Sequence, residues 1–288
     1  MVSPKQPVYC KQRSAPKIIR LVTTSELPRE ENELGQELLS NRFGLPSWFW
    51  TVPTQEASGF FHARYIQQPN ESKPDVVQQP CGFKEVHITS RFLIKHYRNP
   101  NHAKVAKPAD ITYYWERLSF FCRWRSSDQS EVLCFLPAGS QSRFKQFAFE
   151  DNIDITPSSP FTPHTNALKH VVSGFHDAVW SWRDAVRDCE RARLMPTKID
   201  SDWVANMHEI ARHVIHTSEM LEMAIHVTQS LIDEANTLYR ERRFPGPYYL
   251  NESCDMKYSK TMLQCQLLRS QALEKRIQNE LQLVRDPN

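Results

Sequence analysis

The chain has 288 residues, of which 40% are hydrophobic and 11% aromatic, enough apolar material for one large or two ordinary folded domains. Its 36 basic and 33 acidic residues give a formal charge of +3, and this near balance argues against a nucleic-acid partner. The chain has no stretch of about 18 consecutive apolar residues, so we expect no membrane span in it.

The seven cysteines favour a reducing compartment. Their number is odd, their spacings are wide and they form no CxxC pair, which argues against a disulfide framework and against a zinc ribbon. Cys122 and Cys134 lie in apolar segments, where a buried, unreactive thiol is expected. Together with the absence of a secretory-type apolar stretch near the start, this pattern predicts a cytoplasmic location.

The first 28 residues are basic. Lysines and arginines precede the first acidic residue, Glu26, while Pro4, Pro7 and Pro16 interrupt any amphipathic helix. A disordered arm over residues 1–28 and a mitochondrial transit peptide both fit this composition, and the prolines favour the arm.

Residues 29–150 read as an α/β or α+β domain. A short helix is predicted over 29–42, and an aromatic cluster follows at Trp48, Phe49 and Trp50, more typical of a core than of a ligand site. Alternating apolar and β-branched residues predict three strands in a mixed or antiparallel sheet. The strand segments are residues 85–97, 111–125 and 131–138.

From residue 163 to 288 the hydrophobic period becomes helical, and we expect a layer of long antiparallel helices. One helix has an apolar face at Leu168, Val171, Phe175, Val179, Trp182 and Val186. A second, from about Ser201 to Arg243, has a regular three-four seam at Val204, Met207, Ala211, Val214, Ser218, Leu221, Ile225, Thr228, Ile232, Ala235 and Tyr239. The last, starting near Ser253 or Asp255, has its seam at Leu263, Leu267, Ser270, Leu273, Ile277, Leu281 and Val284.

Histidines and carboxylates on the second helix are the candidate chemical groups. His208 and His213 are five residues apart, which places them on different helix faces, whereas His213 and His216 could share one. A pair without a third ligand gives little support for a metal site or for enzyme activity. The acids Glu209, Glu219, Glu222, Asp233 and Glu234 could hold a hydrated magnesium ion, but a solvated helix flank that pairs with arginine and lysine is the favoured interpretation.

The segments FGLPSWFW, YYWERLSFFCRWR, HDAVWSWRDAVRDCER, MHEIARHVIHTSEMLEMA and SQALEKRIQNELQLV resemble the soluble region of fungal CorA-like proteins, relatives of CorA magnesium transporters. The most specific resemblances are two family patterns, whose chemical role the sequence does not give. One comprises Trp180, Arg183 and Asp184, and the other Arg276, Asn279 and Glu280.

The resemblance implies a scaffold or regulatory domain of a divalent-cation transporter, with long helices that self-associate. Magnesium is the one cofactor it suggests, and its ligands are unknown. The sequence has no Gly-Met-Asn pore motif, and its last helical pattern runs into the end of the chain. We therefore expect either a truncated transporter domain, membrane-associated in a longer form, or a relative that kept only the scaffold. The alternative is an interaction protein whose coiled-coil-like helices bind a partner.

Overall fold

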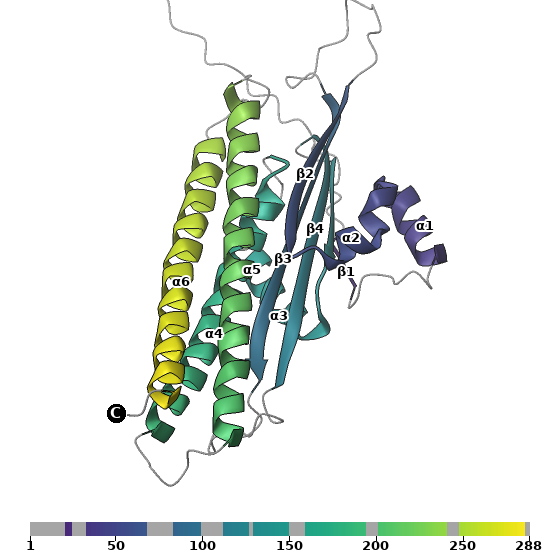
Figure 1. Cartoon of the computed structure of the whole chain (residues 1–288). Coiled ribbons are helices and arrows are strands. Elements are labelled where there is room, and N and C mark those ends of the chain that lie inside the picture. Colours follow the sequence, from purple (N-terminus) through teal and green to yellow (C-terminus); the bar gives the residue numbers. More distant parts are fainter. Residues whose placement is uncertain are drawn as a thin grey trace, which may run out of the picture.

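The computed structural model describes most of the chain as one body of sheet and helices (Figure 1). The described residues are 21–24, 33–67, 83–98, 112–126, 129–149, 159–193, 201–240 and 248–285. Most of the predicted arm lies outside these ranges, but residues 21–24 form a strand.

A five-stranded mixed sheet forms one layer. Its strands are β1 (Leu21–Thr24), β2 (Gly59–Gln67), β3 (Phe83–Arg98), β4 (Thr112–Ser126) and β5 (Gln129–Phe135). The spatial order is β1-β5-β4-β3-β2, in which β1 runs parallel to β5 and all other neighbours are antiparallel. The three predicted strands correspond to β3, β4 and β5, which confirms the predicted mixed sheet.

Three long helices follow the sheet in the chain: α4 (Thr162–Arg193), α5 (Ser201–Arg240) and α6 (Tyr248–Arg285). Consecutive helices run in opposite directions, so α4 and α6 are parallel to each other (Figure 1). Helices α4 and α5 pack against the sheet, and α6 packs against both of them. This arrangement confirms the predicted layer of long antiparallel helices.

Helix α4 buries the predicted face, and α5 buries more than the predicted seam. All six predicted positions of α4 are at most 1% exposed. On α5 the predicted seam meets α6 at Ser218, whose hydroxyl lies 2.9 Å from that of Ser270. Residues outside the predicted seam, which include Trp203, Ile210 and Met220, are buried as well, and α5 also contacts β2 and β3. Tyr239, the last predicted seam residue, is 41% exposed.

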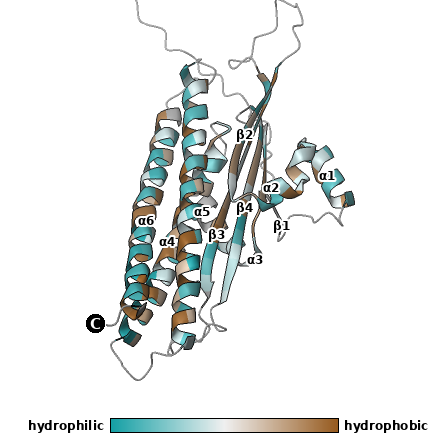
Figure 2. Ribbon diagram, viewed as in Figure 1, coloured by the Kyte–Doolittle hydropathy of each residue, from teal (hydrophilic) through white to brown (hydrophobic). Residues whose placement is uncertain are grey.

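Helix α6 begins at Tyr248, several residues before the predicted start, and lies on the outside of the other two (Figure 1). Leu263, Ser270, Leu273 and Ile277 are buried as predicted. The other seam positions, Leu267, Leu281 and Val284, are only partly buried. In Figure 2 hydrophobic and hydrophilic segments alternate along the helices, as expected when only part of each helix faces a core.

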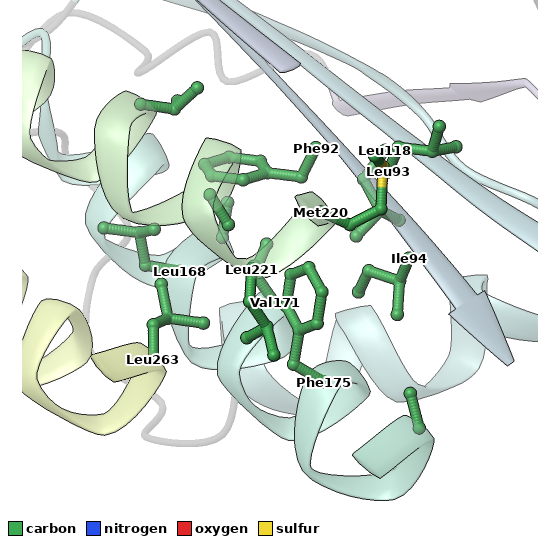
Figure 3. Close-up of a cluster of buried hydrophobic side chains, with 14 of the residues drawn as sticks. Phe92, Leu93, Ile94, Leu118, Leu168, Val171, Phe175, Met220, Leu221 and Leu263 are labelled. Carbon is green, nitrogen blue, oxygen red and sulfur yellow. The ribbon is translucent and has the colours of Figure 1, made fainter. Parts of the chain in front are cut away.

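One hydrophobic core joins the sheet to the helices. Figure 3 shows its centre, where Phe92 and Leu118 of the sheet meet Phe175 of α4, Leu221 of α5 and Leu263 of α6. The ranges predicted as an α/β domain (29–150) and a helical region (163–288) both contribute to this cluster, so in the structure they pack as a single unit.

The opposite face of the sheet is covered by a smaller core. Residues of α1 (Glu33–Phe43) and of the 3-10 turn η1 (Ser47–Trp50) form it together with β4 and β5. The short helix α2 (Val52–Glu56) follows η1 and buries no side chain. Phe49 and Trp50 pack at right angles to each other and against Phe135 of β5. The aromatic cluster of the sequence is therefore core, as predicted.

Two elements, β2 and α3 (Ala138–Phe149), have no clear signal in the sequence. Strand β2 is an edge strand with mostly half-buried side chains, so it lacks a clear alternation of exposed and buried residues. Helix α3 begins after Pro137 and has Gly139 among its first residues. A proline followed closely by a glycine is typical of a loop, so the sequence pattern did not indicate a helix.

Gly174 sets how closely α4 approaches the sheet. A Cβ atom at this position would lie 2.7 Å from Cδ1 of Ile94 and 3.3 Å from a carboxylate oxygen of Glu116. Both of these residues are buried, so neither can move without disturbing the core.

We therefore predict that Gly174→Ala destabilises the protein although alanine favours helices. Overpacking costs about 1–3 kcal/mol, whereas the gain in helix propensity is about 1 kcal/mol, so the free energy of unfolding should fall by about 1 kcal/mol. Urea unfolding measures the change. Gly139→Ala in α3 is the matched control, because a Cβ atom at that position would have no neighbour within 4 Å, and it should be neutral or stabilising. Equal gains in both variants would contradict the prediction.

Candidate functional site

The first family pattern lies on α4 at its contact with α6. The guanidinium groups of Arg183 on α4 and Arg269 on α6 lie over the Trp180 ring, 4.0 and 4.6 Å from its centroid. Arg183 donates from Nε to Oδ1 of Asp184 at 3.0 Å, and Trp180 donates from Nε1 to His176 at 3.2 Å. Trp180 and Arg183 therefore form part of a cation–π contact that Arg269 extends between the helices, while Asp184 orients Arg183.

The second family pattern lies on α6 and joins the same helix. Arg276 donates from Nε and Nη2 to the two carboxylate oxygens of Glu190, at 2.7 and 2.6 Å. Glu280 accepts from Nε of Arg193 at 2.7 Å. Asn279 is exposed on the outer side of the helix. The structure thus brings five of the six predicted residues to one α4–α6 junction and leaves Asn279 outside it.

The α4–α6 junction comprises Trp180, Arg183, Asp184, Glu190, Arg193, Arg269, Arg276 and Glu280. It is mostly polar and only partly buried. The Arg276 and Glu190 side chains are 39% and 29% exposed, so solvent screens their attraction. Such pairs typically contribute about 0.2–1 kcal/mol each. Their bidentate geometry fixes the relative position of two parallel helices more than it adds stability.

A second polar group, the β3 polar centre, lies beneath α4 and α5 and comprises Lys95, His96, Glu116, His170, His213 and His216. Lys95 is only 2% exposed, and its ammonium group lies 4.1 Å from the ring centroid of Tyr113 and 4.7 Å from that of Trp115. It also lies 2.9 Å from Nδ1 of His216, to which it donates when the imidazole is neutral. Burial, together with the charge of Arg212, lowers the pKa of Lys95 to about 8.

His213 and His216 do share a side of α5, as the sequence predicts, with ring centroids 6.3 Å apart. His208 is exposed and does not join them. Burial and the nearby Lys95 charge lower the pKa of His213 to about 4, so it is neutral near pH 7. Among the described residues, no group of three or more His, Cys, Asp or Glu side chains could hold a metal ion.

Glu116 connects β4 to both β3 and α4. Its carboxylate lies 2.7 Å from Nε2 of His96 and 3.1 Å from Nε2 of His170. Burial opposes ionisation, but the hydrogen bonds from His170, His96 and Ser140 outweigh it and hold the pKa of Glu116 well below its usual range.

Near pH 7 Lys95 is therefore cationic, Glu116 anionic and His213 neutral. Lys95 and Glu116 have hydrogen-bond partners from other elements, which is the arrangement that makes a buried polar group specify one packing. His213 instead packs against the rings of Tyr113 and Trp182, and its Nδ1 has no hydrogen-bond partner among the described residues. The centre ties β3 to α4 on one side and to α5 on the other.

The five acids predicted on α5 do not come together in one place. Glu209 pairs with Arg212, Glu234 accepts from Tyr65, and Asp233 accepts from Gln229. Glu219 and Glu222 are exposed one turn apart, and of the five they are the two that have no hydrogen-bond or ion-pair partner among the described residues.

Sequence reasoning missed Lys95, His96, Glu116 and His170. The available signal was a lysine and a histidine inside the apolar run RFLIKHY, because a strand buried on both faces has no solvated position for them. Their partners come from β4, α4 and α5, and their pairing depends on the three-dimensional fold.

Comparisons with known proteins give partial similarities. No family model matches the chain. Over 182 residues it is 24% identical to notoamide biosynthesis cluster protein M′ from Aspergillus versicolor, a match that covers 57% of this chain and only 37% of the length of that protein. The crystal structure of the ZntB cytoplasmic domain from Vibrio parahaemolyticus aligns with a TM-score of 0.42 and 12% identity, over 88% of this chain and 84% of that one.

The long helices do not have the character of membrane spans. Within the described residues, no helix combines the length and the apolar composition needed to cross a bilayer.

We predict that Lys95 makes the free energy of unfolding increase with pH in the alkaline range. Its folded pKa, about 8, is below the ordinary value of 10.5, so between these values the unfolded chain binds more protons and rising pH favours the folded state. The stability of the wild type relative to Lys95→Met should therefore increase from pH 8 to about 10.5. Urea unfolding at a series of pH values measures this difference.

Cysteines and tyrosines also titrate in this range and change the free energy of unfolding. Their contribution is the same in each variant and in the wild type, so it cancels in the difference. Lys84→Met makes the same change at an exposed position of β3 and serves as the control. A constant difference between the wild type and Lys95→Met across the range would contradict the prediction.

Proposed function

We propose that the chain is a regulatory scaffold of the CorA-like type, located in the cytoplasm and acting without catalysing a reaction. In this role α4 and α5 form a layer fixed to the sheet, and α6 is the element that moves and transmits a signal. The target would be the membrane part of a divalent-cation transporter, present in a longer form of the chain or in another subunit. The resemblance of five sequence segments to the soluble region of fungal CorA-like proteins supports this proposal.

The way α6 is attached carries the proposal. Among the described residues, α5 contributes twelve buried hydrophobic side chains to the main core, whereas α6 contributes four. Those four are Met256, Leu263, Leu273 and Ile277. Because burial of such a side chain is worth about 1.5–3 kcal/mol, α6 is held less strongly than α5 and is the long helix that can shift without breaking the core.

The α4–α6 junction would control that shift. Its contacts are ion pairs and cation–π pairs at the surface, whose strength depends on salt and on nearby charges. A change in charge near Glu190 or Glu280 would therefore alter the position of α6 with little change in the core. Packed helices respond to such changes by discrete displacements.

Magnesium is the ion that fits this role. A hydrated magnesium ion needs only one or two carboxylates, and Glu219 and Glu222 are exposed and adjacent on α5. In an assembly, the ion would bridge these carboxylates to a neighbouring copy. The predicted α5 seam is covered by α6 within the chain, so self-association would use outward surfaces instead of that seam.

We predict that magnesium stabilises the protein through Glu219 and Glu222. Millimolar MgCl2 should raise the melting temperature by about 2–4 °C relative to NaCl of equal ionic strength, and light scattering should show a larger assembly. Glu219→Gln/Glu222→Gln should lose both effects. Glu33→Gln/Glu37→Gln, a matched change on exposed positions of α1, should keep them. A monomer with no thermal shift would refute the regulatory role of magnesium.

We also predict that α6 opens before the rest of the fold. Its amides should exchange hydrogen faster than those of α5, and Arg276→Gln should accelerate exchange in residues 268–285 while leaving α5 unchanged. The same variant should lower the free energy of unfolding by only about 0.5–1 kcal/mol, because the pair is partly exposed. Arg187→Gln, at an exposed position of α4, is the control. Equal exchange in α5 and α6 would contradict a movable α6.

A further inference from the structure

Helix α6 carries a second apolar row on the side that faces away from the core. We call this row the outer stripe. Its exposed residues are Leu250, Cys254, Tyr258, Cys265, Leu268, Ala272 and Leu283. Leu268 is 68% exposed and Tyr258 66%, values at which large apolar side chains are not serving the fold of this chain.

The outer stripe has the spacing of a helix-binding seam. At 100° per residue its members fall within about 80° of one another. The row is continuous from Leu250 to Ala272, about 33 Å of helix, and Arg276 and Asn279 occupy the same sector before Leu283. From Cys254 to Ala272, through Tyr258, Thr261, Cys265 and Leu268, the steps alternate between four and three residues. Exposed single hydrophobic residues need no explanation, but an alternating three-four row is the pattern that packs against another helix.

Basic residues line both edges of the outer stripe. Lys257 and Lys275 lie along one edge and Arg269 along the other. Lys257 and Lys275 are exposed and have no ion-pair partner among the described residues. Arg269 is exposed as well, over the Trp180 ring. Asp255 is the exposed acidic residue of this helix. Around the helix axis it lies beyond Arg269, farther from the outer stripe.

This charge pattern disfavours a second copy of the same helix. In a parallel pair the Lys257 edge of one copy would face the Arg269 edge of the other, and in an antiparallel pair each edge would face itself. Both arrangements place like charges together, which is destabilising. The complementary partner is a helix whose apolar seam is flanked by acidic residues.

We propose that the outer stripe of α6 is a docking site for an amphipathic helix of a partner protein, with aspartate or glutamate on both sides of its apolar seam. This site does not depend on magnesium or on any movement of α6. The apolar row supplies the affinity, and the basic edges select the partner and its register.

The test uses two designed helical peptides of about 28 residues, four heptads, each labelled with fluorescein. Both have leucine at the seam positions, and one has glutamate and the other lysine at the flanking positions. Fluorescence polarisation with the full chain should show at least about tenfold tighter binding of the glutamate peptide, and rising salt should reduce this preference.

Leu268→Asp should weaken binding of the glutamate peptide at least about tenfold. Leu34→Asp is the matched control, because Leu34 on α1 is also 68% exposed but lies on the other side of the sheet. Circular dichroism melting should show both variants folded. Lys257→Glu/Lys275→Glu should weaken the glutamate peptide and strengthen the lysine peptide, each by about fivefold.

Three outcomes would overturn the proposal. These are equal binding of the two peptides, equal effects of Leu268→Asp and Leu34→Asp, and a dimer in light scattering that Leu268→Asp converts to monomer. The last would show that a second copy covers the stripe. None of these outcomes bears on the magnesium experiment, so the two proposals succeed or fail separately.

Discussion

The close approach of α4 to the sheet at Gly174 is the constraint on which the other contacts depend. His170, Gly174, Ala178 and Trp182 follow one another at steps of four, so they form one buried row along α4. With no side chain at Gly174, the neighbouring turns reach β3 and β4: His170 binds Glu116, and Trp182 donates to the backbone oxygen of Lys95 at 3.3 Å. The part of the β3 polar centre around Glu116 therefore depends on the close approach of α4.

The long helices could be predicted from sequence because their burial repeats at a fixed period over many turns. The predicted face of α4 and most of the α5 seam are buried as expected. The sequence pattern did not predict two strands. Strand β2 is a half-buried edge strand without a clear alternation, and β1 pairs in parallel with β5, a segment more than a hundred residues away in the chain. The α5 and α6 seams meet at Ser218 and Ser270, as expected of two antiparallel helices joined by a short connection. Because α6 covers the α5 seam within the chain, that seam does not account for the self-association that the resemblance implies.

The candidate site was predictable in part for a related reason. The family patterns on α4 and α6 drew attention to the residues of the α4–α6 junction, but neither pattern indicates that Arg276 reaches Glu190. The outer stripe was present in the sequence of α6 as a second three-four row beside the buried one. Only the structure distinguishes the row that faces the core, around Leu273, from the row that faces solvent, around Leu268.

The order of charges at the α4–α6 junction has a consequence for how α6 can move. The two helices are parallel, with Glu190 followed by Arg193 on one and Arg276 followed by Glu280 on the other. Sliding α6 by one turn in either direction would place like charges opposite each other, Glu280 against Glu190 or Arg276 against Arg193. Repulsion between like charges therefore opposes a one-turn displacement of α6 along its axis. It does not oppose a tilt of α6 or a movement away from α4.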